Sequence, residues 1–267
     1  MGLVDFAKRS KGKIEDQLLP QRFVYHHIPK CGGTSVGRAL RKRYLLSQAT
    51  VTPESSFRAF EIFTARNDRE KMLIDVLDLR EQMLLYHLFE DVRGVSLHVR
   101  FSEIAYQRFK DNYKFVTMLR DPVKRFVSHY HWSYGKPQAH ARIEDDFETF
   151  LESPRAKRIG ATYVEYLCGL PKDVPTDSDE AVSAAISNLG KFSVVGDISD
   201  TRSFEQDIRK ELGVRVKIKH ENKGSKASRS RSELENPEWR AKIESLCAPD
   251  IAVWKAANAV QGGRDAQ

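Results

Sequence analysis

The sequence has few cysteines and no long apolar run. Its three cysteines, Cys31, Cys168 and Cys247, are scattered, so neither a disulfide framework nor the ligand spacing of a metal site is present. We therefore expect a reducing environment. The first twenty residues hold no apolar stretch of signal-peptide length, because basic residues between positions 8 and 13 interrupt them. No run approaches the roughly 20 apolar residues that span a bilayer, so no transmembrane segment is expected.

The chain also lacks internal repeats and a convincing linker. Its 267 residues are 40% hydrophobic, which suffices for the core of one large domain. We expect a basic segment at residues 1–20 and a single domain at residues 21–267. Lys and Arg outnumber Asp and Glu by 44 to 37. This modest surplus favours an anionic ligand, whereas a nucleic-acid-binding protein would be more basic over a smaller domain.

Strand and helix patterns alternate along the chain. Apolar runs are typical of buried strands at 22–28, 115–119 and 192–195, and the alternation at 94–101 predicts a strand with one polar face. Helices are predicted from 33 or 34 onward, at 67–90 and 102–109, from 122 onward, and at 147–151, 181–189, 204–212, 239–247 and 251–259. Polar loops are predicted at 135–146 and 219–231. Together these elements predict an α/β fold with a central, mostly parallel sheet flanked by helices.

The segment FVYHHIPKCGGTS runs from a predicted strand into a loop with two glycines. The usual phosphate-loop pattern G-x-x-x-x-G-K-[ST] is absent, because Lys30 precedes Gly32 and Gly33. Glycines allow the main chain to approach an anion closely, and the following helix directs its N–H groups and positive dipole end at the same place. Lys30 adds a full charge, and Thr34 and Ser35 add hydroxyl donors. The segment is therefore a candidate anion-binding loop, although a ligand-free turn is the competing interpretation.

A second candidate anion site lies in the segment LRDPVKRFVSHY. Arg120 stands at the carboxyl end of a predicted strand, where open α/β sheets bind ligands. Ser128 lies on the following helix, away from its apolar stripe. The Arg guanidinium matches phosphate oxygens and Ser offers one hydroxyl. Two such sites fit a ligand with anionic groups at both ends of a nucleoside.

These motifs resemble those of sulfotransferases that use 3′-phosphoadenosine 5′-phosphosulfate (PAPS). HIPKCGGTS is similar to their 5′-phosphosulfate loop, and LRDPVKRFVSHY to their 3′-phosphate motif. The chain looks most like the carbohydrate group that includes heparan sulfate 2-O-sulfotransferase (sulfotransferase family 2), and FETFL, EYLCG and FSVVGDISD resemble weaker blocks of it. The resemblance covers residues 22–257 and implies a P-loop-like sulfotransferase fold, PAPS as the donor and no metal ion.

The resemblance also assigns donor contacts. The segment HENKGSKAS looks like the loop that covers the 3′-phosphate, which implies contacts from Asn222, Lys223 and Ser225. Cys31 stands where the family usually has Thr or Ser, so its side chain would bond the donor more weakly while its N–H is retained. A thiol between Lys30 and a helix N-terminus can also have a lowered pKa and oxidise readily. An inert small residue is the simpler interpretation.

Sulfuryl transfer by in-line displacement needs a cation for the leaving phosphate, donors for the sulfuryl oxygens and a base for the acceptor hydroxyl. Lys30 suits the first task, and the loop amides with Thr34 suit the second. We choose His98 as the base, because a neutral imidazole near pH 7 takes up a proton. SLHVRF resembles the segment that carries the base in the heparan sulfate group, although Ser96 stands where a second histidine is frequent there.

Other assignments stay open. The rival bases are His26, His27, His129 and His131. Arg100, His131 and Trp132 are candidate acceptor contacts, because Arg suits an anionic sugar and aromatic rings pack on a sugar face, but each is equally suited to surface packing. The acceptor is expected to be a glycan or another hydroxyl-bearing compound, with no nucleic acid as partner. The oligomeric state is open.

Two alternative functions remain at this point. A kinase-like nucleotide enzyme with an altered phosphate loop would need an acidic residue for Mg²⁺, and no clear one follows an apolar strand. A non-catalytic polyanion-binding protein is compatible with the basic loop at 219–231, but would make both anion motifs coincidental. Eukaryotic carbohydrate members of the family are anchored in the Golgi. Without an anchor we expect a bacterial cytoplasmic enzyme, or a Golgi lumenal one if an anchor has been removed.

Overall fold

The computed structural model describes residues 16–17, 21–138, 141–219 and 233–264, with side chains up to residue 259. Most of the segment 1–20 and nearly all of the loop 219–231 lie outside these ranges. The strands are β1 (Arg22–His26), β2 (Gln48–Val51), β3 (Gly94–Leu97), β4 (Tyr113–Leu119) and β5 (Val194–Asp197). The helices of the first half are α2 (Gly33–Arg41), α3 (Pro53–Thr64), α4 (Arg69–Phe89), α5 (Glu103–Phe109) and α6 (Pro122–Ser133). Those of the second half are α7 (Phe147–Leu151), α8 (Pro154–Gly160), α9 (Thr162–Leu167), α10 (Asp179–Leu189), α11 (Thr201–Leu212), α13 (Pro237–Leu246) and α14 (Ala248–Arg264).

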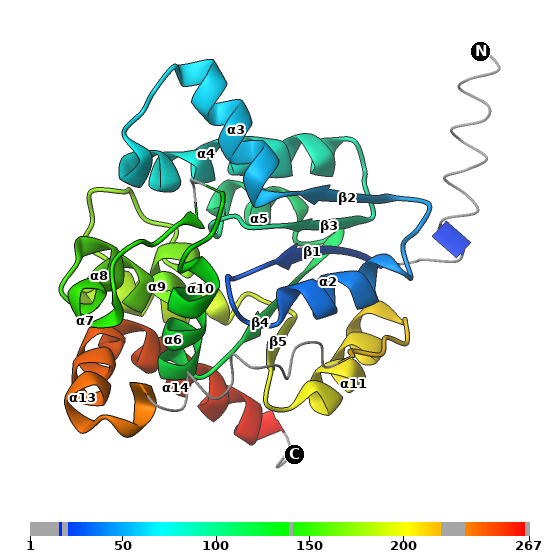
Figure 1. Ribbon diagram of the computed structural model, residues 1–267. Helices are drawn as coiled ribbons and strands as arrows, with labels where there is room; N and C mark the ends of the chain where they lie inside the picture. The colour runs from blue at the N-terminus through cyan, green and yellow to red at the C-terminus, as the bar shows by residue number, and fades with distance from the viewer. Residues whose placement is uncertain (1–15, 18–20, 139–140, 220–232, 265–267) are drawn as a thin grey trace.

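The five strands form one parallel sheet in the order β2-β3-β1-β4-β5 (Figure 1). The chain extends the sheet first to one side of β1 and then to the other, so β1 and β4 flank a topological switch point. His26 at the end of β1 pairs with Leu97 of β3 and with Thr117 of β4. The carboxyl ends of these three strands therefore lie side by side, and the predicted parallel α/β architecture is confirmed.

The prediction of a polar face for residues 94–101 was wrong. The strand β3 ends at Leu97, and all four of its residues are buried, Ser96 included. Parallel sheets are covered by helices on both faces, so both faces of a strand are dry and alternation carries no information about exposure. In Figure 1, α2 crosses in front of the sheet and α5 lies behind it. His98 consequently follows the strand instead of belonging to it.

Local capping residues explain where several helices begin. Ser102 accepts a hydrogen bond from the Ala105 N–H at the start of α5, and Asp121 accepts one from the Lys124 N–H at the start of α6. Pro122 occupies the first turn of α6, where its missing N–H costs nothing. The cap at α6 fixes the turn that directly follows the carboxyl end of β4.

The second half of the chain packs α6, α8, α9 and α14 around a buried ion pair. Arg125 of α6 lies 3.2 Å from Asp250 of α14, and neither side chain is exposed. Asp250 also accepts hydrogen bonds from the Tyr163 and Val164 N–H groups at the start of α9. This network holds α9 against the end of β4. Among the described residues, no helix has both the length and the apolar character needed to cross a bilayer.

Candidate functional site

The loop between β1 and α2 adopts an unusual main-chain path. Lys30 has φ 66° and Gly32 has φ 73°, so two residues occupy the left-handed region. A lysine there is strained by on the order of 1 kcal/mol, which is common at ligand sites. The helix α2 begins at Gly33 without a side-chain cap or an acidic residue in its first turn. Its N-terminal dipole is therefore not neutralised by its own helix.

Gly33 has no room for a side chain. A Cβ atom there would lie 1.8 Å from the imidazole of His27. The His27 ring in turn stacks on His98, with ring centroids 3.9 Å apart. Gly33 thus allows the two imidazoles, which follow neighbouring strands, to lie against the start of α2.

The two candidate anion sites touch each other. The Arg120 guanidinium, after β4, donates a hydrogen bond to the Lys30 carbonyl at 3.4 Å. The Tyr163 hydroxyl joins them a second time, because it accepts from the Arg120 N–H at 2.9 Å, donates to the Arg120 carbonyl and lies 3.5 Å from Cys31 Sγ. The sequence analysis missed Tyr163, whose helix α9 lies far from both motifs along the chain.

The environment of Cys31 favours the simpler interpretation, an inert residue, over the hypothesis of a reactive thiol. Its side chain is fully buried between Tyr163 and the Pro29 carbonyl. Burial raises the pKa of the Cys31 thiol to about 11, because a thiolate would lose its hydration. The thiol is inert and packs the loop from beneath, and any contact of Cys31 with a bound anion is left to its main chain.

A cavity of about 240 Å³ opens where β1 and β3 end. Six residues singled out in the sequence line it, namely Lys30, Thr34, His98, Trp132 and the rival bases His27 and His129. Lys30 Nζ lies 5.1 Å from the centre of the Trp132 ring, a cation–π contact that positions the ammonium group. The sequence analysis did not assign Arg80, which also lines the cavity and has only 5% of its surface exposed.

His98, the candidate base, lies at the smaller cavity. Its Nδ1 atom is buried and has no hydrogen-bond partner among the described residues. Burial lowers the pKa of His98 well below its usual value, and the charges of His27 and Arg80 lower it further. The imidazole is therefore neutral at pH 7 and has a ring nitrogen available to accept a proton.

The rival histidines fall into different environments. His26 is 1% exposed and packs among Phe101, Phe115 and Phe192, which makes it a core residue. His27 and His129 line the 240 Å³ cavity with His98, and burial lowers the pKa of both. His129 remains the structural rival to His98 as a base.

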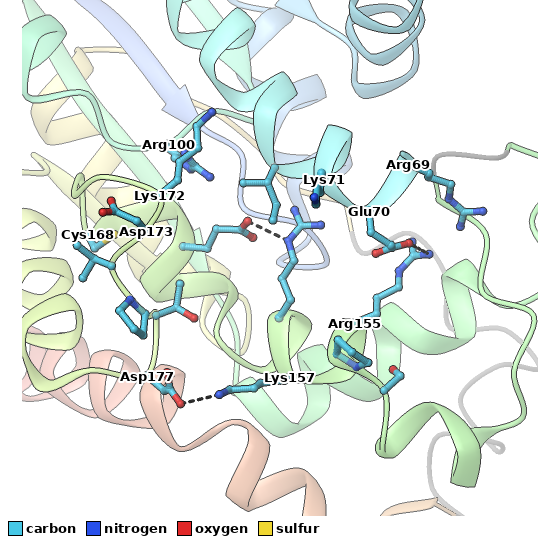
Figure 2. Close-up of a pocket in the computed structure, with 18 of the residues that line it drawn as sticks. Arg69, Glu70, Lys71, Arg100, Arg155, Lys157, Cys168, Lys172, Asp173 and Asp177 are labelled. Atoms are coloured by element: carbon cyan, nitrogen blue, oxygen red, sulfur yellow. Dashed lines mark hydrogen bonds and ion pairs between the residues drawn. The ribbon is translucent and has the colours of Figure 1, made fainter. Parts of the chain in front are cut away.

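A larger cavity, of about 710 Å³, adjoins the first (Figure 2). Arg155, Arg158 and Glu165 line both cavities, so α8 and α9 form the border between them. Figure 2 shows Arg69, Glu70 and Lys71 of α4 on one side of the larger cavity, with Arg155 and Lys157 of α8 opposite. The sequence analysis named only Arg100 from this lining, and Arg100 lies 3.6 Å from Asp78.

The remaining predicted residues are not all brought together. Gly32, Gly33, Ser35 and Cys31 belong to the loop beside the smaller cavity but do not line it, and Ser128 is half-buried on α6. His131 lines neither cavity, and its Nε2 lies 3.1 Å from Glu233 Oε1. Asn222, Lys223 and Ser225 lie outside the described residues. Their predicted roles stay predictions.

Comparison with known proteins identifies the group of proteins that shares this sequence pattern. The sulfotransferase family (Sulfotransfer_2) matches residues 20–254. The crystal structure of a sulfotransferase from Alicyclobacillus acidocaldarius is similar at 20% sequence identity and a TM-score of 0.43, and the match covers 88% of this chain and 98% of that one. None of the curated proteins matches the sequence.

Proposed function

Because the chain belongs to the sulfotransferase family, a group of PAPS-dependent enzymes, we propose that it transfers the sulfuryl group of PAPS to a hydroxyl of a carbohydrate. The observation that carries this proposal is the meeting of three strand ends, where Lys30, Arg120 and His98 follow neighbouring strands. Two of these residues are cations suited to anions, and the third is a neutral base beside them.

The donor would be held at the two candidate anion sites, which contact each other at the ends of β1 and β4. The uncapped start of α2, with Gly32, Gly33, Thr34 and Ser35, suits the 5′-phosphosulfate, because main-chain N–H groups and hydroxyls donate to its oxygens. Arg120 and Ser128 suit the 3′-phosphate. When bound, PAPS supplies an activated sulfuryl group attached to a phosphate oxygen.

Lys30 and His98 would act on opposite sides of the transfer. The Lys30 ammonium stabilises negative charge that develops on the leaving phosphate oxygen. His98 takes the proton of the acceptor hydroxyl while the new O–S bond forms and the S–O bond to phosphate breaks. The products are a sulfate ester and adenosine 3′,5′-bisphosphate. Both side chains line the same cavity, as this division of roles requires.

The experiment is transfer of labelled sulfate from PAPS to a panel of glycans and simple alcohols. We expect a labelled glycan in the presence of EDTA, and heat of binding when the bisphosphate nucleotide is titrated into the protein. The Lys30→Met variant should lose both turnover and nucleotide affinity. Lys110→Met removes a positive charge at the C-terminal end of α5, outside both cavities, and should lose neither. A properly folded sample that binds no bisphosphate nucleotide would refute the proposal.

The experiment also tests the alternatives. Phosphate transfer from ATP that stops on addition of EDTA would identify a kinase-like enzyme. Salt-sensitive binding to polyanions without nucleotide affinity would identify a non-catalytic binding protein.

A further inference from the structure

The two adjoining cavities differ in how their positive charges are compensated. We propose that the larger cavity binds the acceptor, and that this acceptor is an uncharged polyhydroxylated compound, a neutral sugar or glycoside, and not an acidic glycan. The proposal rests on the proposed sulfuryl transfer and adds to it the chemical class of the acceptor.

The smaller cavity carries an excess of positive charge. Lys30 and Arg80 line only this cavity, whereas Arg155 and Arg158, which it shares with the larger cavity, are paired with Glu70 and Glu165. Among the described residues, the buried Arg80 guanidinium is hydrogen-bonded to neutral oxygens, those of the Ser56 and Tyr166 hydroxyls and of the Pro53 and His98 carbonyls. A buried cation without a carboxylate partner favours an anion nearby. The anion expected there is the sulfuryl group of the donor.

Six of the eight cations that line the larger cavity are paired with carboxylates, and the other two, Arg69 and Lys71, are balanced in number by the lining carboxylates Asp145 and Asp173. Two pairs involve residues of α8, and a third joins the loop after α9 to α4. The closest approaches are 3.3 Å for Arg155–Glu70, 2.9 Å for Lys157–Asp177 and 2.8 Å for Lys172–Asp75. Figure 2 labels the residues of the first two pairs, and a dashed line joins Lys157 to Asp177.

Further pairs continue this pattern along the cavity. Arg100 lies 3.6 Å from Asp78, Arg142 lies 2.8 Å from Glu144, and on the border with the smaller cavity Arg158 donates to Glu165 at 3.0 Å. Arg158 also donates to the Leu73 carbonyl, so its position is fixed from two sides. Six of the eight cations of the cavity wall are therefore held in ion pairs before any acceptor arrives.

This arrangement disfavours an acidic acceptor. A ligand carboxylate would have to displace a protein carboxylate that remains nearby and repels it, since like charges at close range are strongly unfavourable. A sugar hydroxyl meets no such conflict, because it donates to the carboxylate and accepts from the guanidinium of the same pair. Apolar side chains complete the wall, among them Leu170, Pro171 and Pro175. They suit the C–H face of a sugar ring, and the volume lies in the range of small-ligand sites.

The test compares acceptors that differ only in charge. 4-Nitrophenyl β-glucoside and β-glucuronide, and the corresponding galactoside and galacturonide, are offered with labelled PAPS, together with neutral and uronic-acid oligosaccharides in one competition mixture. We expect label in the neutral compounds, with kcat/KM at least about tenfold above that of the charged partner, a difference of one like-charge contact. Preferential labelling of the uronic acids would overturn the proposal.

A second measurement asks whether the ion pairs cause the preference. Asp177→Asn and Glu70→Gln each release a cavity cation, so each should shift the kcat/KM ratio towards the glucuronide by about threefold, the scale of an exposed pair. Asp111→Asn, an exposed carboxylate outside the cavity, should leave the ratio unchanged. A merely structural role of Asp177 or Glu70 would lower both rates together, and an unchanged ratio in both variants would count against the proposal.

Failure of the inference and failure of the proposed function are distinguishable by nucleotide binding. If the protein binds the bisphosphate nucleotide but labels no sugar, the proposed acceptor class is refuted and the proposed use of PAPS is not. A protein that binds no such nucleotide refutes the proposed function itself.

Discussion

The Tyr163 hydroxyl bonds to both the N–H and the carbonyl of Arg120 and lies beside the thiol of Cys31. One phenol thus contacts both loops, the main chain of Arg120 in one and the thiol of Cys31 in the other, and the Lys30–Arg120 hydrogen bond joins the same loops across 90 residues of chain. Tyr163 lies beneath the proposed donor site and lines neither cavity. Its role is to position the two loops relative to each other.

The variant Tyr163→Phe should weaken binding of the bisphosphate nucleotide by roughly tenfold, the effect of about 1–2 kcal/mol from a lost buried hydrogen bond. Calorimetric titration measures the affinity. Tyr113→Phe is the matched control, because its hydroxyl bonds to the Val92 carbonyl at the opposite end of β4. Equal nucleotide affinity in both variants would remove the positioning role.

A comparison of kcat in two alanine variants distinguishes His98 from His129 as the general base. The variant His98→Ala should lower kcat by roughly 10²–10⁴-fold, the usual contribution of a general base, with nucleotide affinity retained. His129→Ala should lower it far less. The pH profile of kcat/KM in the parent enzyme should fall on the acid side with a midpoint below 6.5, because the pKa of His98 lies well below that value. The reverse ranking of the variants would make His129 the base.

At the scale of helices and strands, the sequence predicted those elements whose signals are local. The strands β1 and β4 follow from apolar runs, and α2, α5 and α6 begin within one residue of the predicted positions 33, 102 and 122. The strand β2 was missed because the four residues QATV carry no pattern of their own and pair only once β3 is present. The error over β3 has the same origin, since helices from elsewhere decide what a strand buries.

The residues of the candidate site also divide into those that a local sequence pattern identifies and those that only the folded chain brings together. Lys30, Thr34 and His98 could be named from the sequence because each follows a strand within a recognisable segment. Tyr163, Arg80, Arg155 and Arg158 lie on helices without a distinguishing pattern, and only the folded chain brings them to the cavities. No motif in the sequence marks Arg158 as a site residue, yet Arg158 borders both cavities.

The junction of α6, α9 and α14 should be the most sensitive packing point outside the sheet. Asp250→Asn leaves the buried Arg125 without its counter-charge, which typically costs about 3–5 kcal/mol of the free energy of unfolding. Urea denaturation of Asp250→Asn and of Glu244→Gln, an exposed partner of Arg240 on α13, provides the comparison. The surface variant should unfold like the parent, and a similar result for Asp250→Asn would show that the buried pair adds no stability.

For the whole molecule, one buried and three half-buried imidazoles make the free energy of unfolding depend on pH. Burial lowers the pKa of His26 and of His27 to about 4, and that of His98 and His129 well below 6.5. The folded chain therefore binds fewer protons than the unfolded chain, whose histidines titrate near 6.5. Stability should be constant with respect to these groups above pH 6.5 and decline as the pH falls from 6.5 towards 4.

The fully buried His26 isolates this effect from catalysis. Its contribution to the decline is about 3 kcal/mol, from a pKa that falls from 6.5 to about 4. His26→Phe should therefore flatten the dependence of the urea midpoint on pH between 7 and 4.5. A parent protein with the same midpoint at both pH values would contradict the linkage.

Arg155 and Arg158 border both cavities, and this position bears on how a turnover ends. Whatever hydroxyl compound arrives, it departs as an ester with one more negative charge, and its way out passes two guanidinium groups. The sulfate of the ester forms in the smaller cavity, whose excess of positive charge attracts it more than it attracted the incoming alcohol. Release of the ester should then limit the steady-state rate. Rapid mixing should show an initial burst of about one product per enzyme, and added salt should raise the steady-state rate.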